Sequence, residues 1–301
     1  MTALRTRVRR LLDRATGPYR AQLDARLASL GDELARTREE LKNVQRALRI
    51  ISYEEPANRR RLYELRRDSE YEKAFKERDP LVSFVIPTYD RPESLRDVAL
   101  PSILGQTYPN VEVFVIGDGA SPETAEAVAA VDDPRVTYFN RPYRGPYEEK
   151  EATWLAPGTP AYNEGLFRAR GRWIAAMADD DAVRPEHTRT LVDVAQEHGY
   201  EACYGAVLVH FEDGHECELG DFPPRPGSMA LQATVYHSGL ARFIHSELID
   251  TLFDESNDWS KIRRMMRLGI YIGMVDEIVT DKVETNRTLA DYGWLTPRAV
   301  R

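Results

Sequence analysis

The chain has 301 residues, of which 42% are hydrophobic and 30% are charged, a composition that is typical of a folded globular protein and excludes a largely disordered one. Residues 1–80 carry 20 Lys/Arg and 14 Asp/Glu, which leaves 21 basic and 35 acidic side chains for residues 81–301. Because carboxylates repel phosphate groups, an acidic body of this kind would need a cation in order to bind a phosphate-bearing ligand.

The N-terminal segment is predicted to be a long helix with a narrow apolar stripe. From Leu23 to Ile51 the apolar residues step by four and three, and Thr37 is the one interruption. A stripe this narrow must be covered, either by a second copy of the chain in a coiled coil, which makes a homo-oligomer, or by the body of the same chain. Pro56 is expected to end the helix.

The first residues combine apolar and basic side chains, with Leu4, Val8 and Leu11 among arginines. Two readings stay open: a peripheral contact with an anionic membrane surface, or a solvated helix end. The segment has no apolar core like that of a secretory signal, and no stretch approaches the roughly 20 apolar residues of a membrane span. Cys203 and Cys217 do not face each other in the predicted hairpin, in which Cys217 falls opposite His210. We therefore expect a reduced, cytoplasmic protein, with peripheral membrane contact as the alternative.

From residue 81 onward, predicted strands and helices alternate. The expected strands are 81–86, 111–116, 136–139 and 173–178, and the expected helices are 91–106, 122–131 and 163–170. This alternation predicts an α/β fold with a largely parallel sheet that binds ligands at the carboxyl ends of its strands. The expected domains are a helical extension (1–79) and an α/β domain (80–301) with halves 80–185 and 186–301.

Three consecutive aspartates, Asp179, Asp180 and Asp181, follow the strand predicted at 173–178. Adjacent ionised carboxylates repel one another, and a hard divalent cation such as Mg²⁺ or Mn²⁺ would remove that conflict. The residues alone also allow a solvated acidic turn before the helix that begins near Pro185.

Four motifs, in the right order, resemble family 2 glycosyltransferases. Residues 82–91 (VSFVIPTYDR) resemble the first strand of that family, and residues 115–121 (VIGDGAS) resemble its second-strand acidic turn, with Gly117 in place of the first acid. The glycines and the Trp-Ile pair of residues 163–174 match the helix and strand before the family's D-x-D motif. The aspartate triplet with Pro185 matches that motif itself. The resemblance covers roughly residues 81–290.

The resemblance implies a GT-A fold, a Rossmann-like domain with a mostly parallel central sheet and flanking helices. It implies a metal-dependent inverting glycosyltransferase that uses Mn²⁺ or Mg²⁺ and a UDP-, dTDP- or GDP-sugar donor. The acceptor hydroxyl is left unidentified, and no nucleic-acid partner is expected.

The resemblance also assigns roles to residues of this chain. Pro87, Tyr89 and Asp118 would bind the nucleotide base, where a Tyr face can stack and a carboxylate can accept an imide N–H. Asp179 would face the ribose or diphosphate. Asp180 would ligate the metal, and Asp181 would bind the metal or a water on it.

Asp258 aligns with the catalytic base of the family, in a segment where Asn257 replaces a Glu. The residues alone also allow Asp258 to be a helix N-cap. Arg91 and His237 are candidates for donor or acceptor contacts, and a buried core histidine is the alternative for His237. Arg144 or Lys150 would have to replace the basic residue with which some relatives contact the diphosphate.

Two other functions fit parts of the pattern. A sugar nucleotidyltransferase shares a Rossmann-like domain, but it usually has a glycine-rich loop after the first strand, where this chain has Pro87-Thr88-Tyr89-Asp90-Arg91. The second alternative is a scaffold in which a catalytically impaired transferase domain carries a coiled coil. It rests on the departures at Gly117 and Asn257.

Overall fold

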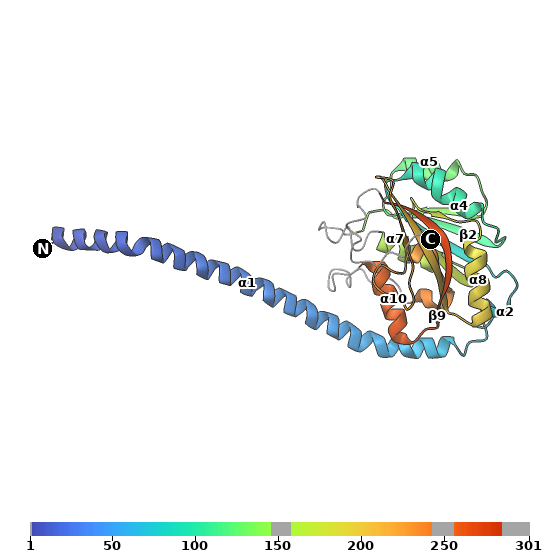
Figure 1. Ribbon diagram of the computed structural model, residues 1–301, viewed down its shortest axis with the longest axis horizontal. Coiled ribbons are helices and arrows are strands. Elements are labelled where there is room, and N and C mark those ends of the chain that lie inside the picture. Colours follow the sequence, from blue (N-terminus) through green and yellow to red (C-terminus); the bar gives the residue numbers. More distant parts are fainter. Residues whose placement is uncertain (1, 146–157, 243–255, 285–301) are drawn as a thin grey trace. The chain divides into compact units, whose positions relative to one another are not determined.

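The computed structural model describes residues 2–145, 158–242 and 256–284, and its contacts divide the chain into two compact units, residues 1–54 and 55–301. Helix α1 runs from Thr2 to Leu65 without a break (Figure 1). The expected helix end at Pro56 is therefore wrong.

Tertiary contacts explain why the helix continues past Pro56. An interior proline costs a helix about 3 kcal/mol. In the turns that follow, Leu62 is buried, Leu65 packs on Gly239, and the Arg59 guanidinium donates to the carbonyl of Arg267 at 3.0 Å. These contacts hold the last turns helical. They also place residues 55–79, expected in the extension, within the second compact unit.

The second unit is built on one nine-stranded sheet, counted over the described residues, in the order β3-β2-β1-β4-β8-β6-β9-β5 with β7 paired to β6. Its strands are β1 (Val82–Thr88), β2 (Val111–Gly117), β3 (Val136–Asn140), β4 (Trp173–Ala176), β5 (Ala182–Val183), β6 (Ala202–Phe211), β7 (Glu216–Leu219), β8 (Thr234–His237) and β9 (Ile272–Glu284). Strands β3, β2, β1 and β4 are parallel, as the alternation predicts. Beyond β4 the sheet is mixed, because β8 runs antiparallel to both β4 and β6.

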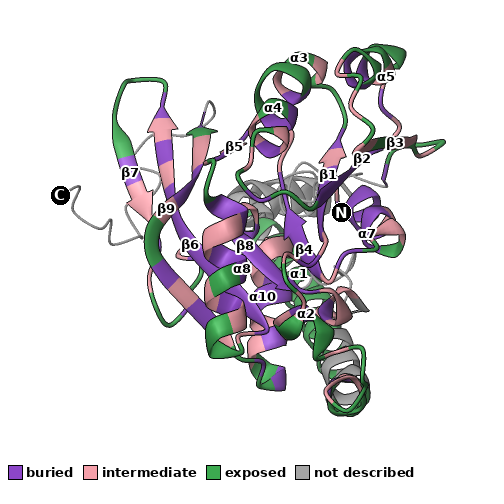
Figure 2. Cartoon of the chain, turned by 90° about the vertical axis from the view of Figure 1, so that its right-hand side faces the viewer, coloured by how far each residue is buried: buried purple, intermediate pink, exposed green. Residues whose placement is uncertain are grey.

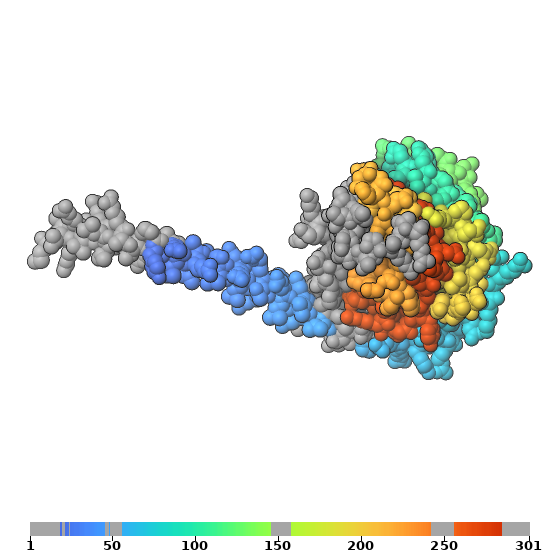
Figure 3. All heavy atoms as spheres, in the orientation of Figure 1, coloured from blue at the N-terminus to red at the C-terminus, as the bar shows by residue number. Residues whose placement is uncertain are grey.

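Helices cover both faces of this sheet. They are α2 (Lys73–Lys76), α3 (Pro92–Ser94), α4 (Leu100–Leu104), α5 (Pro122–Ala129), α7 (Thr159–Arg168), α8 (His187–His198) and α10 (Asn257–Leu268). A π-helical turn, Leu95–Ala99, joins α3 to α4, where the sequence predicted one helix. Pro101 has no N–H and interrupts the regular hydrogen-bond pattern there. Figure 3 shows α8 in yellow beside β9 in red on the surface of this unit.

The central strands are buried on both faces, as parallel strands between two helical layers must be (Figure 2). Alternate side chains of β1 enter different clusters. Phe84 and Ile86 pack with residues of α4 and α8, whereas Val85 packs with residues of α7 and α10. The strand is therefore held from both sides, which fixes the direction of its carboxyl end.

The β6–β7 hairpin is present as predicted, but its register differs by one residue. Cys217 lies opposite Val209, whereas the sequence placed it opposite His210. The difference arises at the tip, where the Phe211 N–H donates to the carbonyl of His215 at 2.9 Å and so closes a five-residue turn. Both cysteines of the chain are buried and free, which confirms that they form no disulfide. None of the helices that the structure describes combines the length and apolarity needed to cross a membrane.

Candidate active site

The carboxyl ends of β1, β2 and β4 bring together three segments that are far apart in the sequence. Thr88 ends β1, Asp118 follows β2, and Asp179 follows β4. The Thr88 hydroxyl donates to Oδ2 of Asp179 at 2.8 Å, and the Asp118 N–H donates to the carbonyl of Thr88 at 2.8 Å. The predicted donor-site residues therefore share one edge of the sheet.

Two arginines of the segment after β3 contact the residues expected at the nucleotide base. The guanidinium carbon of Arg144 lies 3.6 Å from the centre of the Tyr89 ring. The buried Asp118 carboxylate pairs with Arg141 and accepts the Gly145 N–H at 3.1 Å. Tyr89 and Asp118, which were expected to bind the base, thus contact Arg144 and Arg141 of the same chain in this structure.

Two glycines let the backbone close around this edge. A Cβ at Gly117 would lie 2.4 Å from Oδ1 of Asn140, whose side-chain amide bonds both backbone groups of Ala120. The departure at Gly117 therefore leaves room for Asn140. A Cβ at Gly158, the N-cap of α7, would lie 2.9 Å from Cβ of Pro87, and its φ of 69° also favours glycine.

Arg91 neutralises two members of the aspartate triplet. Its guanidinium forms an ion pair with Asp180 and lies 3.5 Å from Oδ1 of Asp179. Burial raises the pKa of Asp179, while the Thr88 hydroxyl and Arg91 act in the opposite direction. Arg91 thus lies directly at the acidic motif.

Asp181 is the least compensated carboxyl of the triplet. The residue is 1% exposed, and its Oδ2 accepts the Gln232 amide at 3.1 Å, but its Oδ1 has no hydrogen-bond partner. Burial, together with the charge of Asp180, raises the pKa of Asp181 to about 7, against the lowering effect of Lys282. A buried carboxylate oxygen without a partner fits a site for a hard cation.

The described side chains could supply only part of a metal coordination shell. Within residues 2–145, 158–242 and 256–284, no three His, Cys, Asp or Glu side chains gather into a cluster that could hold a metal. Mg²⁺ usually takes one or two carboxylates and completes its shell with waters and substrate phosphates. Asp180 and Asp181 fit that mode of binding.

Asp258 lies at the start of α10 but does not cap the helix. The N-cap is Ser256, whose Oγ accepts the Trp259 N–H at 3.4 Å, so the capping alternative for Asp258 is wrong. Burial raises the pKa of Asp258 to about 6, and the charges of Lys282 and Lys261 oppose that rise. A pKa raised in this way is compatible with the role of general base that the resemblance assigns to Asp258.

Lys282, which the sequence did not single out, links the two acidic groups. Its charge lowers the pKa of both Asp181 and Asp258. Its position follows from sheet pairing, because Asp281, its neighbour on β9, lies opposite Ala182, the residue after Asp181. The available signal was a lysine near the end of a strand that also carries several acidic residues, and it does not indicate a partner.

Two further contacts surround Asp258. Lys261, one turn later on α10, is fully buried and donates to the Tyr236 hydroxyl at 3.0 Å, which lies 3.1 Å from the Tyr162 hydroxyl. Asn257 donates its side-chain amide to the Thr159 hydroxyl at 2.8 Å and so ties α10 to α7. The departure at Asn257 therefore has a structural partner.

His237 does not join these groups. It ends β8 opposite Trp173, the first residue of β4, so it lies at the edge of the sheet opposite the aspartates. Its Nδ1 accepts the Gly239 N–H at 3.0 Å and its Nε2 donates to the carbonyl of Tyr71 at 3.0 Å, while burial lowers its pKa. The structure thus supports a neutral core histidine and not a donor contact.

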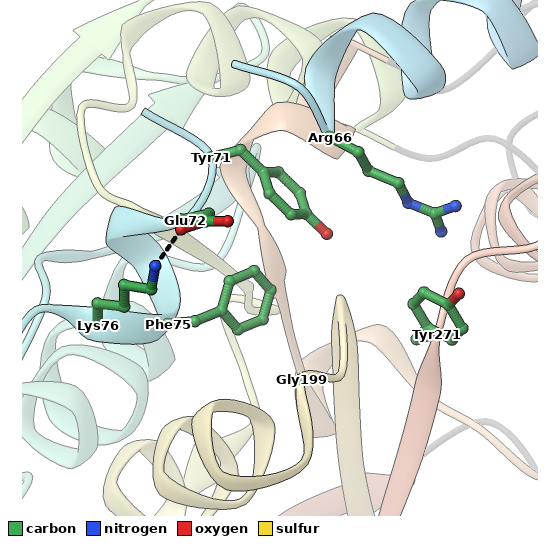
Figure 4. Close-up of a pocket in the computed structure, with 7 residues that line it drawn as sticks. All are labelled: Arg66, Tyr71, Glu72, Phe75, Lys76, Gly199 and Tyr271. Atoms are coloured by element: carbon green, nitrogen blue, oxygen red, sulfur yellow. Dashed lines mark hydrogen bonds and ion pairs between the residues drawn. The ribbon is translucent and has the colours of Figure 1, made fainter. Parts of the chain in front are cut away.

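A cavity of about 350 Å³ opens on that same far side, near the starts of β6 and β9 (Figure 4). Arg66 in its wall makes two hydrogen bonds to Glu201, at 2.7 and 2.6 Å, and Lys76 pairs with Glu72. Both basic side chains of the cavity are thus engaged within the chain. The residues that line it are Arg66, Tyr71, Glu72, Phe75, Lys76, Gly199 and Tyr271.

Some expected residues lie outside the described part of the chain. They are Lys150 and residues 253–255, which come just before Asn257 in the segment that aligns with the family.

Parallel strands β3-β2-β1-β4, continued by antiparallel β8 and carrying carboxylates at their carboxyl edge, define a glycosyltransferase fold of the GT-A class. Residues 83–151 and 158–264 match the family described as glycosyl transferase family 2. The chain belongs to this family.

Curated relatives agree with this assignment. The chain is 32% identical over 177 residues to the succinoglycan biosynthesis protein ExoO of Rhizobium meliloti (strain 1021), a match that covers 56% of this chain and 45% of the relative. It is 31% identical over 137 residues to the GalNAc(5)-diNAcBac-PP-undecaprenol beta-1,3-glucosyltransferase of Campylobacter jejuni, over 44% of this chain and 40% of the relative. The chain thus spans less than half the length of these relatives.

Solved structures share the fold. TarS of S. aureus, residues 1–349, solved in complex with UDP-GlcNAc, has a TM-score of 0.52 at 17% identity, over 69% of this chain and 59% of that one. The mannosyltransferase PcManGT of Pyrobaculum calidifontis, solved with GDP-Man and Mn²⁺, has a TM-score of 0.51 at 15% identity, over 85% of this chain and 71% of that one.

Proposed function

We propose that the protein is a metal-dependent, inverting glycosyltransferase that moves a sugar from a nucleotide-diphospho sugar to an acceptor hydroxyl. The observation that carries the proposal is the pair of carboxyls, Asp181 after β4, whose Oδ1 has no hydrogen-bond partner, and Asp258 on α10, which does not cap its helix. The charge of Lys282 lowers the pKa of both carboxyls, and Lys261 also lowers that of Asp258. A donor bound between the two carboxyls would have one on the side of its diphosphate and the other on the side of the attacking hydroxyl.

The donor would bind along the edge formed by β1 and β2. Tyr89 and Pro87 would hold the base, and Asp118 would accept its imide N–H in place of the present Arg141 contact. The relatives solved with UDP-GlcNAc and with GDP-Man support a nucleoside diphosphate as the handle of the donor. Asp179, fixed by the Thr88 hydroxyl, would face the ribose or the diphosphate.

Asp180 and Asp181 would hold Mn²⁺ or Mg²⁺. The support for this is Oδ1 of Asp181, which is buried without a hydrogen-bond partner. When bound, the cation supplies positive charge that stabilises the leaving diphosphate. Arg91, which now pairs with Asp179 and Asp180, would then be free to contact a phosphate oxygen.

Asp258 would take the proton of the acceptor hydroxyl as that oxygen attacks the anomeric carbon from the face opposite the diphosphate. One C–O bond forms while the C–O bond to the diphosphate breaks, and the configuration at the anomeric carbon inverts. The buried Lys261, which is hydrogen-bonded to Tyr236, and Tyr162 would form the wall of the site next to Asp258.

Calorimetry tests the donor half of the proposal. The full chain is titrated with UDP, dTDP and GDP, each with and without Mn²⁺, and one nucleotide is expected to bind more tightly with the metal. Asp118→Asn should weaken the binding of that nucleotide, and the remaining binding should still depend on the metal. Absence of metal-dependent binding by all three nucleotides would overturn the proposal. A nuclear magnetic resonance assay of the first product then reports inversion or retention directly.

A pH profile tests the role of Lys282. Because Asp258 acts as a base only when ionised, kcat/KM should fall as the pH drops through about 6, the pKa of that carboxyl. Lys282→Met removes a charge that lowers this pKa, so the acidic limb should move to higher pH by up to about one unit. Lys282→Arg is the matched control and should keep the limb in place. An unchanged limb in Lys282→Met would refute the electrostatic role.

A further inference from the structure

The apolar stripe of α1 is fully formed and uncovered within the first compact unit. Each of its seven apolar side chains is between 49% and 63% exposed. They follow a heptad repeat in which positions a and d alternate, and they are Leu23, Leu27, Leu30, Leu34, Leu41, Val44 and Leu48. The segment is rich in strong helix formers, and Gly31 costs it only about 1 kcal/mol, but in water an exposed apolar stripe on such a helix gains stability from packing against a partner.

Thr37, the one polar residue at a d position, does not interrupt the stripe. Its hydroxyl donates to the carbonyl of Glu33, one turn earlier, at 3.0 Å. Because this donor is already satisfied within the helix, Thr37 can enter a packed seam without an unpaired hydroxyl hydrogen. The heptad repeat therefore runs without a break from residue 23 to residue 48.

One charged pair that flanks the stripe favours a second copy of the chain in parallel direction. With Leu27 and Leu34 at a, Glu33 and Glu40 fall at g, and Arg38 falls at e. In a parallel, in-register pair, each g residue faces the e residue five positions later on the partner helix. Glu33 of each copy then faces Arg38 of the other copy, which gives two equivalent ion pairs across the seam.

We propose that residues 23–48 of α1 form a parallel, in-register, two-stranded coiled coil with the same segment of a second copy of this chain. Two strands follow from the width of the stripe, because an assembly of more strands buries the e and g positions, which here hold charged residues such as Glu33, Arg38 and Glu40. Since the chain continues from residue 48 toward residues 55–301, the second compact unit of each copy follows the same end of the coil.

Sedimentation of the full chain measures the association. The wild-type protein is expected at the mass of two 34.4 kDa chains. Leu34→Glu with Leu41→Glu places charges in the seam and should halve that mass. Ala28→Glu with Ala35→Glu is the matched control, because it adds the same charge on the exposed outer face of the same helix. A wild-type mass of one chain, or seam and control variants of equal mass, would overturn the proposal.

Charge exchange tests the direction and register. Glu33→Arg and Arg38→Glu should each weaken association, and the double exchange should restore it, because residues five apart pair between copies and are not neighbours on one helix. In an antiparallel pair, g faces g and the double exchange would not restore association. Restoration therefore supports the parallel register, and its failure rejects it.

A cysteine at a d position, next to the two-fold axis of the coil, gives an independent test of the register. Thr37→Cys should form a disulfide between copies on oxidation, whereas Ala35→Cys on the outer face should not. The native cysteines, Cys203 and Cys217, are buried and give a low background. Equal crosslinking of both variants would contradict the in-register seam.

Discussion

Asp258→Asn is expected to lower kcat by about 10²- to 10⁴-fold, the usual contribution of a general base. The substitution keeps the shape of the side chain, and Ser256, which caps α10, is untouched. Binding of the nucleotide and metal should therefore persist in calorimetry while turnover, measured by product mass spectrometry, is lost.

Asp132→Asn is the control for this experiment, because Asp132 is an exposed residue with a φ of 47° that asparagine also tolerates. It should leave kcat unchanged. A turnover in Asp258→Asn within a few-fold of the wild type would reject Asp258 as the base. The scaffold alternative would instead be favoured if the wild type itself shows no turnover and cellular function survives the substitution.

Asp181→Asn is expected to lower metal-dependent activity by at least about 100-fold, since even the residues that support metal ligands typically contribute 10- to 100-fold. The oxygen that would bind the cation becomes an amide group, and metal-dependent nucleotide binding should weaken in parallel. Titration with Mn²⁺ at saturating donor measures the effect. Full activity at the Mn²⁺ concentration that saturates the wild type would contradict the assignment.

The same substitution should stabilise the metal-free protein at alkaline pH. The pKa of Asp181 is raised from the ordinary 3.8 to about 7, so above pH 7 the folded state holds a buried charge that the unfolded state exposes to water. Each pKa unit is worth roughly 1.4 kcal/mol, so the gain in unfolding free energy has an upper limit of roughly 4 kcal/mol.

This gain should be largest at pH 8 in a chelator and should vanish below about pH 4, where the carboxyl is protonated in both states. Chemical denaturation at the two pH values measures it, and Asp132→Asn again serves as the control. A loss of stability at pH 8 would show that the Asp181 carboxylate is satisfied without a cation. Activity and metal-free stability are therefore expected to move in opposite directions at this residue.

The sequence alone was sufficient for the parallel half of the fold and for the edge that carries the acids. Strands β1, β2, β3 and β4 lie where the alternation predicted them, within a few residues. The reason is physical. Buried parallel strands need continuous apolar runs, and their carboxyl ends must share one edge, so the sequence was enough to expect Tyr89, Asp118 and Asp179 close together.

Local patterns failed where long-range contacts decided the outcome. Pro56 does not end α1, because burial of Leu62 and the contacts of the following turns outweigh the local penalty. His237 was a candidate for the site, but the antiparallel pairing of β8 with β4 carries it to the opposite edge. Neither effect is encoded in the residues next to these positions.

Only the tertiary structure brought Lys282 to Asp181 and Asp258. The strand order β4-β8-β6-β9-β5 is not sequential, so the neighbours of β9 depend on pairings between residues about 100 positions apart. Periodicity reports which face of an element is apolar, but it does not report which element will cover that face or what charge it will bring. The acids of the site follow from the sequence, whereas their burial and the lysine that partly offsets its effect on their pKa follow from the fold.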